Sequence, residues 1–222
     1  MSAHQTTANG ASPVVASPGT GDRWARAGGF IADGLRLAGA LTSYLVSRRP
    51  VRALADEAVR SLPGDELVAD PKLRWNVATT IDARPAEIWP WLVQMGCRRA
   101  GWYSYDGLDN GGVRSADRII AELQEVRVGD VFPMRPRDSD TYVVRRIEPE
   151  RALVIGDAAG GMSWAFVLEP VDEHTTRLIT RVRATYDGRA LGLFFRLFWH
   201  PVHFAMQRRQ LLNLKQLVEV TP

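Results

Sequence analysis

The sequence predicts an α+β fold in which a curved antiparallel β-sheet wraps around a long C-terminal helix. Three observations predict it: a run of short alternating strands over residues 128–186, a helical pattern from 189 to 220, and a strand and helix before that run. Strands grouped together, with the helices apart from them, are typical of α+β proteins rather than of doubly wound sheets. We therefore expect two layers, with a cavity between the sheet and the terminal helix.

The first strand is predicted over residues 73–81, where apolar side chains fall on alternate positions. Its expected inward side chains are Trp75, Val77, Thr79 and Ile81. Pro85 follows shortly and suits the first turn of a helix. We expect that helix over 85–97, because apolar residues recur there at helical spacing. These apolar residues are Ile88, Trp89, Leu92, Val93 and Met95.

The later strands are predicted from alternation and from turn residues between them. After a turn, one begins at Val128-Gly129-Asp130-Val131-Phe132, and the others cover Tyr142–Ile147, Ala152–Ile155, Ser163–Val171 and residues 176–186. Gly160-Gly161 follows a strand and precedes another, so it is expected to form a hairpin turn rather than a phosphate-binding loop.

The last predicted strand carries two alternating sets of side chains. The set expected to face inward is Leu178, Thr180, Val182, Ala184 and Tyr186. The set expected to face water is Arg177, Ile179, Arg181, Arg183 and Thr185. This assignment assumes that one face of the sheet is solvated, as is common in antiparallel sheets.

The helical pattern after the strands contains Pro201, which is expected to kink or divide it. Its second half presents a core-facing apolar stripe, formed by Leu211, Leu214, Leu217 and Val218.

The chain divides into three predicted parts, with a turn at residues 62–65 as the main boundary. Residues 1–22 are expected to be a disordered tail, because they are rich in small and polar residues and almost lack large apolar ones. Residues 23–60 are expected to be an amphipathic helical arm that is separable from the rest. Residues 61–222 are expected to be the folded α+β domain.

The arm has a wide apolar face over residues 24–47, followed by Arg48, Arg49 and Arg52. It is expected to dock on its own domain or on a partner, or to lie on a membrane surface through residues 24–52. A membrane-spanning helix is a third alternative, but it would carry Asp33 and Arg36 near its middle, at about 2.5–3.5 kcal/mol each.

Charge and cysteine usage exclude several classes of function. The net charge of +3 belongs to residues 1–60, and the remainder is balanced, so no basic stripe for nucleic acid is expected on the domain. The single cysteine, Cys97, excludes a disulfide framework and favours a cytoplasmic setting, peripheral at the membrane if the arm binds lipid. His200 and His203 have no evident third ligand, so no metal and no cofactor is expected.

Several segments of residues 62–220 resemble the helix-grip superfamily of START-like proteins, also called SRPBCC, and within it the bacterial polyketide cyclase/dehydrase-like branch. The segments that carry the resemblance are Leu62-Pro63-Gly64-Asp65-Glu66-Leu67, Ile81-Asp82-Ala83-Arg84-Pro85, Trp89-Pro90-Trp91-Leu92-Val93-Gln94-Met95-Gly96, Ala100-Gly101-Trp102-Tyr103-Ser104-Tyr105-Asp106, Ala116-Asp117-Arg118-Ile119 and Met206-Gln207-Arg208-Arg209. The resemblance implies that residues 61–222 are a START-like domain that binds a ligand in an internal cavity.

The candidate ligand-binding residues are polar or aromatic side chains on elements expected to line that cavity. They are Trp89, Gln94, Trp102, Tyr103, Tyr105, Asp106, Trp164, Phe166, Tyr186, Phe195, Trp199, His203 and Phe204. Asp106 or a tyrosine could act as an acid or base, but a structural role at the turn explains the same residues.

Two functions follow from these predictions. The first is binding or carriage of an apolar small molecule or lipid. The second is an aromatase/cyclase-type enzyme that orients a bound polyketide or aromatic substrate. The sequence shows no nucleophile–base pair, so binding is preferred and the catalytic residues stay unassigned. Several acid–base groups with perturbed pKa converging on the cavity would favour the enzyme.

Overall fold

The computed structural model describes residues 33, 35–39, 51–136, 141–186, 188, 192–193, 197 and 200–221. Among these residues, six strands form one antiparallel sheet in the order β1-β6-β5-β4-β3-β2. The strands are β1 (Leu73–Ile81), β2 (Val131–Pro133), β3 (Thr141–Glu148), β4 (Ala152–Gly156), β5 (Met162–Pro170) and β6 (Thr176–Ala184).

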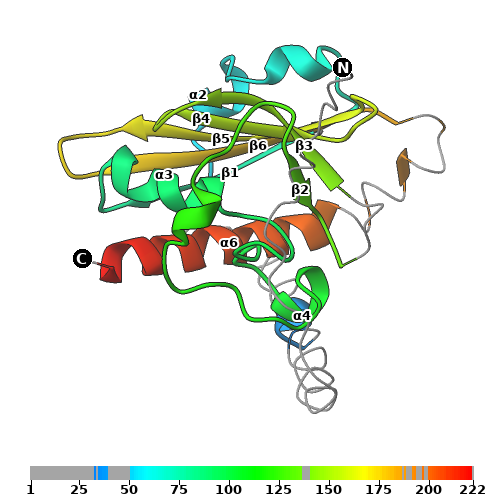
Figure 1. Cartoon of the computed structure of the whole chain (residues 1–222). Coiled ribbons are helices and arrows are strands. Elements are labelled where there is room, and N and C mark those ends of the chain that lie inside the picture. Colours follow the sequence, from blue (N-terminus) through cyan, green and yellow to red (C-terminus); the bar gives the residue numbers. More distant parts are fainter. Residues whose placement is uncertain are drawn as a thin grey trace, which may run out of the picture.

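The long C-terminal helix α6 (His200–Val220) lies along one face of this curved sheet (Figure 1). The shorter helices are α2 (Ala55–Val59), η2 (Asp65–Val68), α3 (Pro85–Val93), α4 (Asp106–Asp109) and η3 (Ala121–Leu123). A curved antiparallel sheet that holds a long terminal helix is the helix-grip fold, so the predicted fold class is confirmed.

The core between the sheet and α6 contains most of the predicted inward side chains, although Tyr186 is not among them. Trp75, Val77 and Ile81 of β1 are buried in it, and so are Leu211 and other members of the helix stripe. Helix α6 is described from His200 to Val220, and most of the residues just before it lie outside the described part of the chain, so the predicted effect of Pro201 stays a prediction.

Helix α3 begins at Pro85 as predicted, but it ends at Val93 rather than at Cys97. Glu87 caps the N-terminus of the helix, because its carboxylate accepts a hydrogen bond of 2.7 Å from the Arg84 backbone N–H. The early end follows from Gly96, whose φ of 126° cannot continue a helix.

The prediction that the arginine face of β6 meets water is wrong. The exposed fraction is 1% for Arg181, 7% for Arg183 and 0% for Ile179. Residues 51–69, which include α2 and η2, cover this second face of the sheet (Figure 1). The face therefore belongs to a second, smaller core.

Buried ion pairs hold this cover on the sheet. Arg181 donates 2.6 Å to the Asp65 carboxylate, and Arg183 lies 3.3 Å from the other oxygen of that carboxylate. Arg177 bonds Glu57 at 2.7 Å. Gly64 forms the predicted turn with a φ of 90°, and a Cβ there would lie 2.6 Å from a Val154 methyl group. Residues 51–60, assigned from sequence to the arm, thus contribute to the cover.

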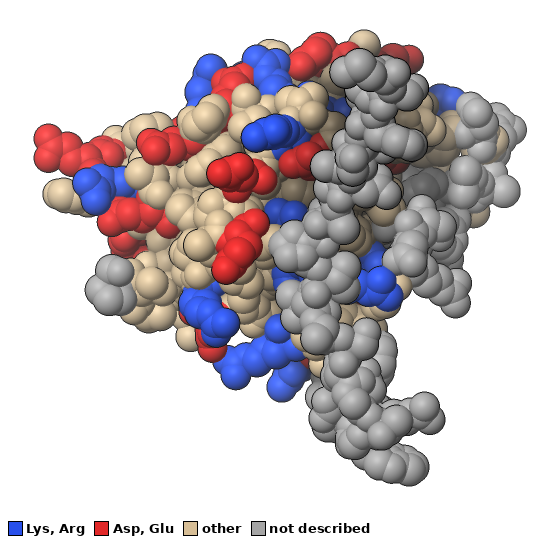
Figure 2. Space-filling model, viewed as in Figure 1, with Lys and Arg blue, Asp and Glu red and all other residues tan. Residues whose placement is uncertain are grey.

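Asp33 and Leu37, in the arm before residue 51, both lie against the domain. The Asp33 carboxylate accepts a hydrogen bond of 2.7 Å from the backbone N–H of Gly107 in α4, and Asp33 is buried. Among the described residues, no helix has the length and hydropathy needed to cross a membrane. Acidic and basic side chains both occur across the face that Figure 2 shows.

Candidate functional site

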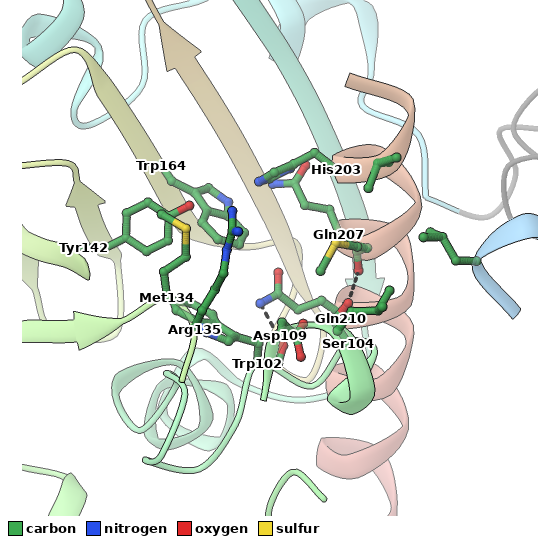
Figure 3. Close-up of a pocket in the computed structure, with 14 residues that line it drawn as sticks. Trp102, Ser104, Asp109, Met134, Arg135, Tyr142, Trp164, His203, Gln207 and Gln210 are labelled. Atoms are coloured by element: carbon green, nitrogen blue, oxygen red, sulfur yellow. Dashed lines mark hydrogen bonds between the residues drawn. The ribbon is translucent and has the colours of Figure 1, made fainter. Parts of the chain in front are cut away.

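A cavity of about 320 Å³ lies between the inner face of the sheet, helix α6 and the loop that carries α4 (Figure 3). Its lining residues are Leu37, Trp102, Ser104, Leu108, Asp109, Met134, Arg135, Tyr142, Trp164, Val202, His203, Met206, Gln207 and Gln210. The volume is near the lower end of the range for small-molecule sites, about 300–1,000 Å³.

One wall of the cavity is aromatic. The rings of Trp102 and Trp164 stack with centroids 5.6 Å apart and planes 16° apart. Tyr142 of β3 meets both indoles edge-on, at 5.8 Å and 5.9 Å. Stacked and edge-to-face contacts are the favoured geometries for aromatic side chains, so this wall is rigid and mostly apolar.

Helix α6 fixes the loop that carries Trp102. Three side chains of α6 donate hydrogen bonds to consecutive backbone carbonyls of this loop. The bonds are 3.0 Å from Gln210 to Trp102, 2.8 Å from Asn213 to Tyr103 and 2.9 Å from Arg209 to Ser104. In the other direction, the Ser104 hydroxyl donates a hydrogen bond of 3.1 Å to the Met206 carbonyl of α6. These bonds hold Tyr103 at a φ of 58°, a left-handed conformation that few non-glycine residues adopt.

The opposite wall is a polar stripe on α6, made of His203, Gln207 and Gln210. Their spacing of four and three residues places them on one helix face, and Figure 3 shows all three on the cavity side. Gln207 accepts a hydrogen bond of 2.8 Å from the Trp75 indole, which fixes its side chain. The His203 ring lies edge-on to Trp164 at 5.2 Å, so the two walls meet there.

Two titratable groups of the lining are uncharged at neutral pH. Burial, with a further contribution from the Asp106 charge, raises the pKa of Asp109 to about 8. Burial lowers the pKa of His203 to about 4. The Asp109 carboxyl therefore holds its proton, while the His203 imidazole is neutral and only weakly basic.

Several buried polar atoms of the lining have no hydrogen-bond partner among the described residues. They are Trp102 Nε1, Trp164 Nε1, Asp109 Oδ1 and Gln210 Oε1. An unpaired buried polar group costs about 1–3 kcal/mol, so four around one cavity call for an explanation.

Three of the residues predicted from sequence line this cavity: Trp102, Trp164 and His203. Phe166 lies directly behind Trp164, with ring centroids 4.8 Å apart. Phe195 and Trp199 lie outside the described residues.

Gln94 and Tyr103 form a structural network instead. The Gln94 side-chain amide donates a hydrogen bond of 2.6 Å to the Tyr103 hydroxyl and accepts one of 2.9 Å from the Ile120 backbone N–H. Gln94 is fully buried, and burial raises the pKa of Tyr103. This network joins α3 to the loop before η3, away from the cavity.

The remaining predicted residues lie elsewhere on the domain. Asp106 accepts a hydrogen bond of 2.6 Å from the Ser115 hydroxyl, and Tyr105 packs its ring 4.9 Å from the Arg209 guanidinium. Tyr186 lies beyond the end of β6, where its carbonyl accepts 2.9 Å from Lys72. Trp89 and Phe204 line two other hollows, separate from the Trp102–Trp164 wall.

Four lining residues were not among the predicted ligand-binding residues: Asp109, Tyr142, Gln207 and Gln210. The α6 stripe had a usable signal, because His203, Gln207 and Gln210 recur at helical spacing opposite charged positions. Asp109 stands out in the sequence as part of a polar-aromatic segment, but no local pattern shows that it is buried. Within the described residues, no group of three His, Cys, Asp or Glu side chains could hold a metal ion.

Comparison with known proteins gives similarity at the level of the fold. No family model and no curated protein matches the chain. Among solved structures, the KanY protein is 17% identical, covering 66% of this chain and 97% of that one, with a TM-score of 0.43. The Aha1 dimer from Colwellia psychrerythraea is 18% identical, covering 67% and 97%, with a TM-score of 0.41.

A Polyketide_cyc-like protein from Corynebacterium glutamicum is 15% identical, covering 66% of this chain and 91% of that one, with a TM-score of 0.36. Similarity at this level says nothing about a ligand or an activity. The strand order and the gripped helix define the class: a helix-grip protein with an aromatic cavity between its sheet and α6.

Proposed function

We propose that this protein binds and carries an apolar small molecule or lipid in the cavity between the sheet and α6. The observation that carries the proposal is the cavity itself, with a stacked aromatic wall on one side and the polar stripe of α6 on the other. Small-molecule sites combine mostly apolar walls with a few fixed polar groups, and this cavity has both.

A cavity-filling variant tests the proposal with little risk to folding. Val202 lines the cavity from α6 and is partly exposed, so Val202→Phe places a ring in the cavity. We expect the neutral fluorophore Nile red to bind wild type and to bind V202F about tenfold more weakly. The control is Val220→Phe, the same change at a 69%-exposed site on the same helix. Equal binding by all three proteins would refute the proposal.

An enzyme is the second candidate, because the cavity is lined by one group with a raised pKa, Asp109, and one with a lowered pKa, His203. A protonated Asp109 can donate a proton, and a neutral His203 can accept a hydrogen bond from a substrate. Native mass spectrometry of wild type and Asp109→Asn tests it. An enzyme should co-purify with different small molecules in the two proteins, substrate in the variant and product in wild type. The same bound mass in both proteins favours a carrier.

Membrane contact through residues 24–52 also stays a proposal. In the described part of the arm, Asp33 bonds the domain and Leu37 lines the cavity, which supports docking of this segment on its own domain. Sedimentation with anionic liposomes at low and high salt tests the membrane alternative. Binding that is lost at high salt supports it, and no binding at low salt contradicts it.

A further inference from the structure

A second hollow, of about 360 Å³, lies at the edge of the sheet, where β1 is the outermost strand. Three consecutive residues of β1, Arg74 to Asn76, line it together with residues of the cover and of α6. Consecutive residues of a strand point to opposite faces, so the hollow opens at the strand's edge rather than on either face. It shares no described lining residue with the cavity between the sheet and α6.

The charged lining of this edge hollow is positive. Arg52 of the cover and Arg74 of β1 line it, His200 of α6 adds an imidazole, and none of the described lining residues is acidic. Both arginine side chains are exposed, so their charged ends remain in contact with water. The edge hollow therefore offers cationic donors to a molecule that enters from solvent.

The two arginines lack the carboxylate partner that their neighbours have. Arg181 and Arg183, on the covered face of the sheet, share the carboxylate of Asp65. Within the described part of the chain, the guanidinium groups of Arg52 and Arg74 have neither an ion-pair nor a hydrogen-bond partner. A guanidinium group has a planar fork of N–H donors that matches the oxygens of an anion such as phosphate.

The sheet register adds to the positive charge at this edge. Arg74 lies directly opposite Arg183 in the pairing of β1 with β6. Like charges placed opposite each other destabilise a sheet. Because the Asp65 carboxylate is already bonded to Arg181, an anion in the edge hollow would offset the charge of Arg74.

We propose that the edge hollow is a second binding site, which takes a phosphate group attached to a small apolar group. A phosphate monoester carries about two negative charges at neutral pH and three acceptor oxygens, which suits two guanidinium groups and an imidazole around one hollow. The inference is independent of the proposed function, because the cavity between the sheet and α6 takes no part in it.

The apolar part of the ligand follows from the floor of the edge hollow. Val51, Trp75 and Phe204 line it, and their exposed fractions are 1%, 7% and 6%. A phosphate ion alone would leave this apolar surface in water, whereas an ester with a ring or a short chain would cover it.

An NMR titration of the full-length protein at constant ionic strength tests the ligand class. The probes are inorganic phosphate, phenyl phosphate and phenol, and the readout is the backbone amide signals of residues 74–76. We expect phenyl phosphate to bind about tenfold more tightly than either of the other two. If phenol binds as tightly as phenyl phosphate, or if no probe shifts these signals, the phosphate site is wrong. If inorganic phosphate binds as tightly, only the apolar part of the ligand is wrong.

Two charge-removing variants test the arginines. Arg52→Gln and Arg74→Gln each change an exposed side chain, so both proteins should fold, and each should weaken phenyl phosphate binding about tenfold. Arg118→Gln is the matched control, because it removes the same charge from an exposed side chain in the loop before η3. Equal affinity in all four proteins, or equal weakening by all three variants, would overturn the site.

Phosphate monoesters occur both as soluble molecules and as lipid headgroups, and vesicles distinguish the two sources. Phosphatidylcholine vesicles with and without phosphatidic acid are sedimented with wild type and with Arg74→Gln. Binding that requires phosphatidic acid and is lost in the variant assigns the site to a lipid headgroup. Binding of phenyl phosphate without binding of either vesicle assigns it to a soluble ester. If wild type binds neither phenyl phosphate nor the vesicles, the proposal is overturned.

Discussion

Arg181→Met tests whether the second face of the sheet is a sealed core. The Arg181 guanidinium is 1% exposed and donates to Asp65 at 2.6 Å, to the Arg60 carbonyl at 2.9 Å and to the Asn76 amide oxygen at 3.0 Å. A further bond of 2.5 Å reaches the Glu57 carbonyl. Methionine keeps the apolar part of the side chain, so the variant removes these bonds without leaving a large cavity.

The expected cost follows from what loses its partner. Removal of one member of a buried ion pair costs about 3–5 kcal/mol. Asp65 keeps Arg183 at 3.3 Å and the Leu62 backbone N–H at 3.1 Å, so its charge is not left alone. We therefore expect the lower end of the range, about 3 kcal/mol.

Guanidinium chloride unfolding followed by tryptophan fluorescence gives this difference, provided that the m-value is unchanged. Arg151→Met is the matched control, since Arg151 pairs with Glu148 but its side chain is 69% exposed. It should cost less than about 1 kcal/mol. If Arg181→Met costs no more than this control, the buried pair does not hold the cover on the sheet.

Three further predictions concern the boundary of the domain, the Gln94 network and Asp109. A chain that starts at residue 61 lacks Glu57, so it should unfold at a lower denaturant concentration than a chain that starts at residue 51. Equal unfolding midpoints for the two chains would mean that the arm is separable at residue 60. Gln94→Met should destabilise the fold by about 2–3 kcal/mol, because buried partners lose their bonds, yet leave Nile red binding intact. If Gln94→Met loses Nile red binding while its stability is unchanged, Gln94 contacts the ligand rather than supporting the fold. The pKa of Asp109 is raised from about 4 when unfolded to about 8, so unfolding releases a proton and wild-type stability falls between these pH values. Asp109→Asn should therefore gain stability relative to wild type as pH rises from 4 to 8, and a constant difference would contradict the raised pKa.

Much of the fold could be predicted because it depends on local patterns. Alternating apolar residues gave β1 its observed bounds, Leu73–Ile81, and Pro85 gave the start of α3. The covered face of β6 could not be predicted in this way. Arg181 looks like a solvent-facing residue until its partner Asp65, far away in the sequence, is brought against it. Long-range ion pairs leave no periodic signal.

The site was predicted less completely than the fold, for a related reason. Periodicity assigns a side chain to a face, but a cavity occupies only part of that face. Trp164 lines the cavity, whereas Phe166, two positions along the same face of β5, is packed behind it. Gln94 is polar and buried, which fits a ligand contact, but its amide is used by Tyr103 and Ile120. Only the three-dimensional contacts separate these roles.

The most direct test of the central claim is an NMR titration of the indole N–H signals. The chain has seven tryptophans, and substitution to phenylalanine assigns each signal. On addition of Nile red to the full-length protein, the signals of Trp102 and Trp164 should shift together and saturate, while that of Trp89 should stay in place. Shifts at Trp89 without shifts at Trp102 and Trp164, or no saturable shift at all, would contradict a ligand site between the sheet and α6.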